Sequence, residues 1–351
     1  MYEKENKEIS TYCSFPFTRV KVGPEGNMNF CCHQSPEGVL GNLFEESFED
    51  LWFGDKAESV RNATAVPCLH KFCNTIECPF RYVDLASEVQ PMRVRATGYP
   101  DHLEFDLHGS HCNFGGIRPT PDSACKFCPR SKPNYQEHLD RYPDRTEELI
   151  RKIKHIVRYL RIINISGISE PFWKDKIFDV LDGLDYNKDI QVITTTNGSV
   201  FDRNRQKRFL ETVETSEICF SLDAACPETY LKLRGYNFFD KVCANIESWC
   251  KSRNPKKHQV NIHNNINLLN VHEVEEMVKL CKKLGVERLI LLPTHDCAGT
   301  HRQIGDILVN QDNFEIFSES QRKAEIAASQ AGVRLSITRP LDLGYRAELE
   351  S

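Results

Sequence analysis

The 351-residue sequence has no long hydrophobic run and no strong excess of either charge. Nowhere do eighteen apolar residues follow one another, so it offers no candidate for a membrane-spanning helix. Lys and Arg number 45 against 50 Asp and Glu, a formal net charge of -5, which gives no sign of a polyanionic partner. Residues 1–8 alternate in charge and lack the apolar segment of a secretory signal. We therefore expect a cytoplasmic protein with neither nucleic acid nor a membrane as partner.

Cysteine, by contrast, is abundant, with 15 residues. In a compartment where thiols stay reduced, clustered cysteines indicate metal binding rather than disulfides. One group lies in the first eighty residues, a second group lies near residue 120, and six more are scattered singly after residue 218. Free cysteines are usually small buried apolar residues, and we interpret the scattered six in this way. The first group is Cys13, Cys31, Cys32, Cys68, Cys73 and Cys78, and the second is Cys112, Cys125 and Cys128.

From residue 102 onward, short apolar runs alternate with segments of helical periodicity, which is typical of βα units on a parallel sheet. This pattern predicts an α/β fold, a partial (β/α)6 barrel over residues 96–305 with its functional residues at the carboxyl ends of the strands. Asn270 and Glu273 are spaced as a helix N-cap and its capping partner. The six predicted strands are Leu103–Leu107, Ile162–Ser166, Ile190–Thr195, Glu217–Leu222, Gln259–Leu268 and Arg288–Leu292.

The two ends of the chain differ from this pattern. Residues 1–95 predict a small α+β domain, with strands at Thr18–Val22 and Asn27–Cys31 joined by a glycine turn, and a helix near Phe48–Ala63. Residues 306–351 predict an extension with one long amphipathic helix and an edge strand at Arg334–Ile337.

The second cysteine group follows the first predicted barrel strand directly, with twelve residues between Cys112 and Cys125 and two between Cys125 and Cys128. A closed metal site uses four protein ligands, whereas three thiolates on a 4Fe-4S cluster leave one iron free for a substrate or cofactor. The next three predicted strands end in the polar segments 166–171, 195–198 and 220–223, so all of these groups should share one rim.

These residues resemble the radical S-adenosylmethionine (SAM) family, in which a three-cysteine loop follows the first strand and a Gly-Gly-Glu-Pro-like element ends the second. The resemblance implies that Cys112, Cys125 and Cys128 bind the catalytic 4Fe-4S cluster. It also implies SAM contacts by Phe127, Gly167, Glu170, Asn197, Ser221 and Arg234. The chain departs from the family in its long loop, residues 113–124, and in having Ile168-Ser169 before the glutamate. The alternative is a zinc site on the same cysteines with His108 or His111.

The N-terminal cysteines resemble the SPASM or twitch modules that hold an auxiliary cluster in many radical SAM proteins. The specific element is Gly26, four residues, then Cys31, because glycine permits the tight turn that brings two thiolates together. The resemblance implies a second 4Fe-4S cluster with four thiolates from Cys13, Cys31, Cys68 and Cys73, for which Cys78 or Cys32 could substitute. The alternative is a zinc-ribbon-like unit.

The function implied by the resemblance is reductive cleavage of SAM to a 5′-deoxyadenosyl radical, which abstracts a hydrogen from a peptide or protein side chain and so modifies or oxidises it. A flavodoxin or a ferredoxin-type protein would donate the electron. Candidates for catalysis are Asp223 and the residues after the sixth strand, His295, Asp296 and Cys297. The alternative enzyme is a dehydrogenase or carbon–carbon bond-forming enzyme on a small biosynthetic intermediate, and the alternative outside enzymes is a zinc-binding interaction protein.

Overall fold

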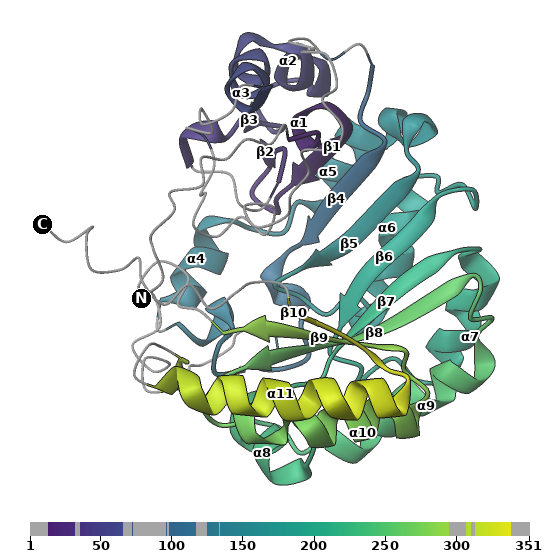
Figure 1. Cartoon of the computed structure of the whole chain (residues 1–351). Helices are drawn as coiled ribbons and strands as arrows, with labels where there is room; N and C mark the ends of the chain where they lie inside the picture. The colour runs from purple at the N-terminus through teal and green to yellow at the C-terminus, as the bar shows by residue number, and fades with distance from the viewer. Residues whose placement is uncertain are drawn as a thin grey trace, which may run out of the picture. The chain divides into compact units, whose positions relative to one another are not determined.

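The computed structural model describes residues 13–31, 36–65, 72, 96, 98–116, 125–132, 134–294, 307–309 and 313–337. Seven residues with predicted roles lie outside these ranges: Cys32, Cys68, Cys73, Cys78, His295, Asp296 and Cys297. The chain forms two compact units (Figure 1). The first unit comprises Met1–Leu107, Asp144–Asn164 and Phe178–Ile190, and the second comprises His108–Pro143, Ile165–Ile177 and Gln191–Ser351. The domain boundaries predicted at residues 95 and 305 remain predictions, since compactness divides the chain differently.

The first unit is built on a short sheet in the order β4-β1-β2-β3. These strands are β1 (Arg19–Val22), β2 (Asn27–Asn29), β3 (Gly41–Asn42) and β4 (His102–Leu107), and β1 pairs antiparallel with β2 but parallel with β4. Gly26, in the turn before β2, has φ +86°, and a Cβ there would lie 2.5 Å from the Asn42 Oδ1. Only glycine fits this turn without strain, as the sequence predicted.

Helices α1 (Phe15–Thr18), α2 (Phe48–Phe53), α3 (Asp55–Ala65) and α5 (Thr146–Ile153) belong to the same unit. The single helix predicted at Phe48–Ala63 is wrong, because Gly54 has extended backbone (φ -76°, ψ 172°) and separates α2 from α3. Arg61 of α3 is fully buried, donates from Nε to the Pro16 carbonyl oxygen at 2.8 Å, and lies 4.6 Å from the Trp52 ring centroid. This buried cation ties the two helices and α1 together.

The second unit contains parallel strands in the order β6-β7-β8-β9-β10. Their bounds are β6 (Gln191–Thr196), β7 (Ser216–Ser221), β8 (His258–Ile266), β9 (Arg288–Pro293) and β10 (Arg334–Ile337). The preceding strand β5 (Ile162–Gly167) has its carboxyl end in this unit. All six predicted barrel strands and the predicted edge strand are present. The alternation of strands and helices confirms the predicted fold class, an α/β partial barrel with a small N-terminal α+β part.

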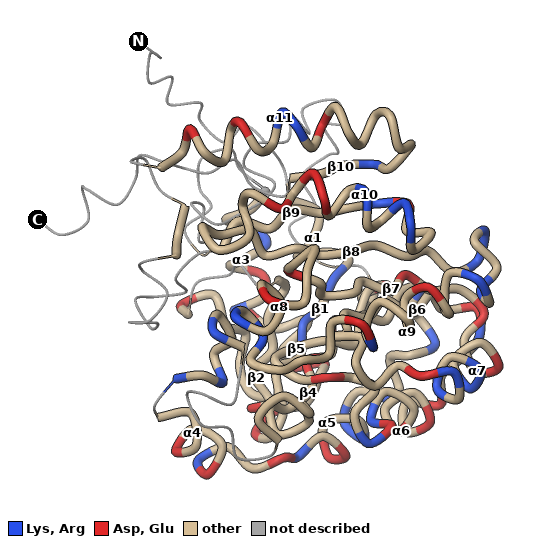
Figure 2. Tube along the Cα trace, turned by 90° about the horizontal axis from the view of Figure 1, so that it is seen from below, with Lys and Arg blue, Asp and Glu red and all other residues tan. Residues whose placement is uncertain are grey.

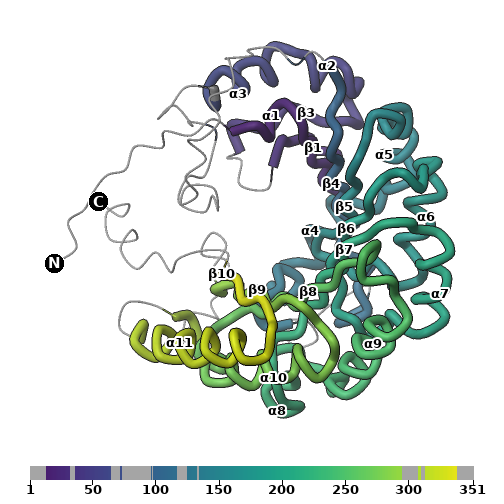
Figure 3. The backbone as a smooth tube through the Cα atoms, turned by 45° about the vertical axis from the view of Figure 1, so that its right-hand side comes forward, coloured from purple at the N-terminus to yellow at the C-terminus, as the bar shows by residue number. Residues whose placement is uncertain are grey.

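Helices α7, α9 and α10 cover the outer side of the strands of this unit (Figure 3). The helices of the unit are α4 (Tyr135–Arg141), α7 (Arg203–Thr212), α8 (Pro227–Arg234), α9 (Phe239–Ser252), α10 (Val274–Leu284) and α11 (Phe314–Ala331), and α6 (Lys176–Gly183) spans the division between the units. An aromatic core lies between strands and helices: Phe201 packs 4.2 Å from Phe172 and 5.2 Å from Trp249 between ring centroids. The long C-terminal helix predicted from the sequence is α11, which packs against α10.

Charges of both signs are spread along α10 and α11 (Figure 2). In α10, Glu275 and Glu276 lie in the first turn and Lys282 and Lys283 in the last, which complements the helix dipole. Asn270 occupies the predicted N-cap position, at the start of the 3-10 turn Val271–Glu273 that leads into α10, but neither Asn270 nor Glu273 makes the side-chain hydrogen bond of a capping pair. Among the helices of the described part of the chain, none combines the length and apolar composition needed to cross a membrane.

Candidate functional site

Cys125 and Cys128 lie on one tight turn. The Cys128 backbone N–H donates to the Cys125 carbonyl oxygen at 2.9 Å, and Cys128 then precedes the 3-10 turn Pro129–Ser131. The carbonyl oxygen of Cys128 accepts from the Ser131 backbone N–H at 2.9 Å and from its Oγ at 2.7 Å. Cys125 is 7% exposed. The turn therefore presents two thiols on a fixed backbone.

Cys112 lies at the start of the long loop, residues 113–124, that leads to Cys125. It ends the 3-10 turn Gly109–His111 that follows β4. Beyond Cys112, the buried guanidinium of Arg130 donates to the carbonyl oxygens of Phe114 and Gly116. These bonds attach the start of the loop to the turn that carries Cys125 and Cys128.

Cys125 is buried and Cys112 and Cys128 are half-buried, and this environment shifts the protonation of all three thiols. Burial raises the pKa of Cys112 to about 12 and that of Cys128 to about 11, and it also raises the pKa of Cys125. The guanidinium groups of Arg130 and Arg234 oppose this effect. Without a metal the thiols hold their protons, so ligand formation must release protons.

This donor set fits an iron–sulfur cluster. Three thiolates supply the protein ligands, and two buried cations offset the negative charge that thiolate ligation brings. Within the described ranges no three His, Cys, Asp or Glu side chains are gathered closely enough to hold one metal ion. Thiolates of a 4Fe-4S cluster each bind a different iron, so a cluster does not require that close grouping.

Glu170, predicted from the second strand's end, is buried and hydrogen-bonded through both carboxylate oxygens. One carboxylate oxygen accepts from the Thr196 Oγ1 at 2.6 Å and the Phe172 backbone N–H at 3.2 Å, and the other accepts from the Asn197 backbone N–H at 2.6 Å. Burial raises the pKa of Glu170 to about 7, although these hydrogen bonds favour its ionised form. Its own N–H donates to the His111 carbonyl oxygen at 2.8 Å, next to Cys112. Gly167 at the end of β5 has φ +106°, a conformation that favours glycine.

Asn197 connects the end of β6 to the cysteine loop. Its Nδ2 donates to the Asn113 Oδ1 at 2.9 Å, and its Oδ1 accepts from the Ser199 N–H at 2.9 Å and Oγ at 2.6 Å. The Asn113 Nδ2 also donates to the Ser199 Oγ at 2.9 Å. Asn197 therefore lies beside Asn113, the residue after Cys112, and its side-chain amide makes hydrogen bonds within the protein.

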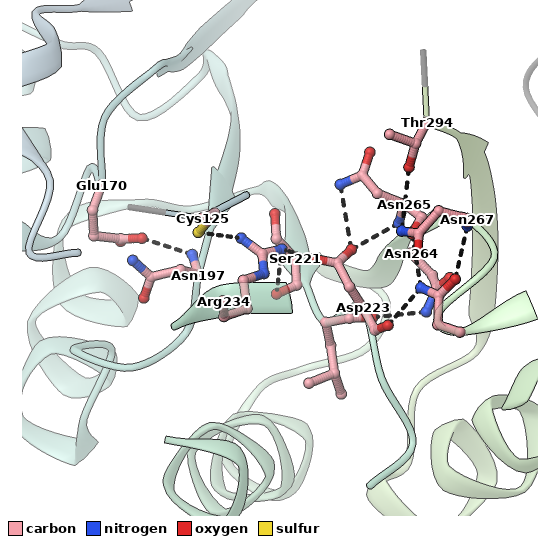
Figure 4. A network of polar contacts seen from close by, with 12 residues as sticks. Cys125, Glu170, Asn197, Ser221, Asp223, Arg234, Asn264, Asn265, Asn267 and Thr294 are labelled. Carbon is pink, nitrogen blue, oxygen red and sulfur yellow. Dashed lines mark hydrogen bonds and ion pairs between the residues drawn. The ribbon is translucent and has the colours of Figure 1, made fainter. Parts of the chain in front are cut away.

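Arg234, at the end of α8, contacts several of the residues that the sequence predicted for the site (Figure 4). Its Nη1 donates to the Cys125 Sγ at 3.5 Å and its Nη2 to the Ser221 carbonyl oxygen at 3.2 Å, and it forms an ion pair with Asp223. The guanidinium carbon lies 5.2 Å from the Phe127 ring centroid. The structure therefore brings these predicted residues together from β7, α8 and the cysteine turn.

Three polar residues that hold this network were not predicted to belong to the site: Asn265, Asn270 and Glu273. Asn265 donates to the Asp223 carboxylate from its backbone N–H at 2.7 Å (Figure 4). The Asn270 Nδ2 donates to the Asp223 carbonyl oxygen at 2.7 Å. The Glu273 carboxylate accepts from the Ala225 N–H at 2.7 Å. The signal that could have found them is the run of four asparagines within residues 264–270, at the end of an apolar strand.

The N-terminal module is described only in part. The Cys13 N–H donates to the Thr64 carbonyl oxygen at 3.5 Å, and Cys31 follows β2, with both residues half-buried. Residues 13–79 match the family model of the SPASM iron–sulfur cluster-binding domain. The match confirms the predicted module, while its ligand set remains a prediction because Cys68 and Cys73 lie outside the described residues.

Comparison with solved structures finds partial similarity at low sequence identity. SuiB of Streptococcus suis bound to its precursor peptide SuiA is 14% identical with a TM-score of 0.48, over 68% of this chain and 49% of SuiB. The protein anSMEcpe with bound AdoMet and a peptide is 17% identical with a TM-score of 0.47, over 67% and 62%. A radical SAM methyltransferase from Sphaerobacter thermophilus is 14% identical with a TM-score of 0.44, over 68% and 67%.

The chain therefore spans about half the length of SuiB. No curated protein matches it in sequence. The SPASM match and the mostly parallel α/β architecture agree with the resemblance to SPASM-containing radical SAM enzymes that the cysteine patterns indicated.

Proposed function

We propose that this protein is a radical SAM enzyme whose catalytic 4Fe-4S cluster is held by Cys112, Cys125 and Cys128. The observation that carries the proposal is the arrangement of one buried and two half-buried thiols with Arg130 and Arg234 beside them, on a loop that follows the carboxyl end of a parallel strand. Carboxyl ends of strands in βα barrels are where catalytic groups collect. When bound, the cluster and SAM together supply reductive cleavage of SAM to methionine and a 5′-deoxyadenosyl radical.

The chain's own residues position and seal this chemistry. The cysteine turn fixes two thiols, and the Arg130 and Arg234 guanidinium groups stabilise negative charge at the sulfurs. The Glu170 carboxylate is proposed to accept a hydrogen bond from the SAM ammonium in addition to its three protein hydrogen bonds, with Gly167 allowing close approach. Phe127, Asn197 and Ser221 are the further proposed contacts of SAM.

A second, auxiliary 4Fe-4S cluster is proposed on Cys13, Cys31, Cys68 and Cys73. The match of residues 13–79 to an iron–sulfur cluster-binding domain supports this assignment. Four thiolates would close the cluster to substrate and suit it to electron transfer or to a structural role. A flavodoxin or ferredoxin-type protein in the cytoplasm is the proposed electron donor.

The proposed substrate is a peptide or protein side chain, from which the radical removes a hydrogen atom. This class follows from the SPASM module, which resembles those that accompany modification of ribosomal peptides. His295, Asp296 and Cys297 are proposed to act at the substrate.

The test is anaerobic purification followed by assay of SAM cleavage. Two clusters predict about eight irons per chain with matching sulfide, and dithionite should produce 5′-deoxyadenosine from SAM. Cys125→Ala and Cys128→Ala should each abolish 5′-deoxyadenosine formation. Cys243→Ala, which removes a cysteine of α9 from the same unit, should leave it intact. Colourless protein that holds zinc and no iron would exclude the proposed function.

A further inference from the structure

Arg234 occupies a junction between two segments that are far apart in the sequence. Arg234 is the last residue of α8, and the helix ends there because Gly235 has left-handed backbone (φ +74°). The Arg234 side chain extends to the cysteine turn. The Leu233 carbonyl oxygen also accepts from the Lys126 N–H at 3.1 Å. The Cys125–Cys128 turn therefore rests on the carboxyl end of α8, and the guanidinium provides the contact to sulfur.

Asp223 is the charged partner of that guanidinium, and it is fully buried, with 0% exposure. Its carboxylate accepts from the Asn265 backbone N–H at 2.7 Å and the Asn265 Nδ2 at 3.3 Å. The Asn270 Nδ2 holds the Asp223 backbone by donating to its carbonyl oxygen at 2.7 Å. Asp223 is thus fixed by β8 and the segment after it, as Figure 4 shows.

The start of α8 is fixed by the same region of the chain. The Glu273 carboxylate, which is buried, accepts from the Ala225 N–H at 2.7 Å and from the Thr229 Oγ1. Both ends of α8 are therefore held, one by Glu273 and one by the pair of Asp223 and Arg234. In the described part of the chain the Asp223 carboxylate is enclosed by Arg234 and Asn265, so we infer that it acts through Arg234.

We propose that Asp223 is a positioning residue: it aligns the Arg234 guanidinium so that one N–H donates to the Cys125 Sγ, and it neutralises that cation beside the cluster. The inference rests on the proposed function and gives Asp223 this role in place of a catalytic one. Hydrogen bonds to cluster sulfurs and the local net charge both set a cluster's reduction potential. The pair therefore holds the potential of the cluster on Cys112, Cys125 and Cys128 at a lower value than an uncompensated arginine would.

The experiment is an EPR-monitored redox titration of the anaerobically purified full chain. The signal that belongs to this cluster is assigned as the one lost in Cys128→Ala. Asp223→Asn, Arg234→Gln and the double variant are compared with the unsubstituted protein. Glu287→Gln is the matched control, because it breaks a carboxylate pair with Arg253, which interacts with Cys250 outside the cysteine turn.

Asp223→Asn should shift the potential of this cluster to a more positive value, and Glu287→Gln should not move it. In the Arg234→Gln background, Asp223→Asn should cause little or no further shift, because the group through which Asp223 acts is gone. Equal shifts in both backgrounds, or no shift in either, would overturn the proposal. If Asp223→Asn alone does not fold, Arg234→Gln is compared with the double variant. Equal potentials of the cluster in these two proteins are expected, and different potentials would refute action through Arg234. Absence of any signal lost in Cys128→Ala would instead count against the proposed function.

Discussion

Replacing Glu170 by glutamine should remove a pH dependence of stability that this carboxyl imposes on the fold. The pKa is 4.5 in the unfolded chain and about 7 in the folded protein, because burial disfavours the charged form. Between these values the folded protein binds more protons than the unfolded chain, so the free energy of unfolding falls as pH rises. From pH 6 to pH 8 the fall due to Glu170 is about 1.3 kcal/mol, worked from these two values.

The assay is urea unfolding at pH 6 and pH 8, with the unsubstituted protein and Glu170→Gln compared at each pH. Glutamine cannot ionise, and because only one of its two terminal atoms is an oxygen, it loses at least one of the three accepted hydrogen bonds at every pH. The lost hydrogen bond should lower the stability by the same amount at both pH values, and the substitution should remove the pH dependence that Glu170 causes. The difference between the two proteins isolates Glu170 from other titrating groups. An equal change of stability between pH 6 and pH 8 in both proteins would refute the reasoning.

The hydrogen bond from Thr196 provides a second check on the same carboxyl. Thr196→Val removes a donor that favours ionised Glu170, so the pKa of Glu170 should rise further. The free energy of unfolding should then fall more steeply between pH 6 and pH 8. Thr194→Val is the matched control on the same strand, because the Thr194 Oγ1 donates to the Ile165 carbonyl oxygen at 2.7 Å instead. Thr194→Val should lower the stability equally at pH 6 and pH 8, without altering its pH dependence.

Three further substitutions test the packing of each unit by denaturant unfolding. Lys21→Met removes the cation that lies 2.7 Å from Glu104 and 2.6 Å from Asp106 on β4, and only Glu104 keeps a second one, Arg19, so the change should cost about 3–5 kcal/mol. The exposed Lys251→Met should change little. Phe201→Ala, at 0% exposure, should cost about 3–5 kcal/mol, against little for Leu231→Ala at 47% exposure. Gly26→Ala should destabilise by more than about 1 kcal/mol because its φ is +86°. Stabilities within error of the unsubstituted protein would contradict each account.

The parallel core was predictable because buried strands leave a strong local signal. Each run such as Ile162–Ser166 is apolar and is bounded by helical periodicity, and tertiary contacts reinforce that preference. The order of the chain likewise predicts Cys112, Cys125 and Cys128 directly after the first barrel strand. Both signals come from residues that are close together in the chain.

What the sequence could not predict depends on partners that are distant in the chain. Asp223 looked like an exposed rim acid, and only the fold shows Asn265 and Arg234 enclosing it. Asn270 and Glu273 have the spacing of a cap, yet they bind the segment before α8, 47 and 48 residues away. The break at Gly54 was missed because the surrounding residues keep helical periodicity on both sides.

The most direct test of the account asks whether SAM binds the iron that the three thiolates leave open. Reduced protein is mixed with SAM labelled at its methionyl nitrogen and carboxylate, and the cluster is examined by electron–nuclear double resonance. We predict hyperfine coupling of the labels to the cluster, and loss of that coupling in Cys125→Ala. A cluster with four protein ligands and no coupling, or a single tetrahedral zinc ion on these cysteines, would contradict the account.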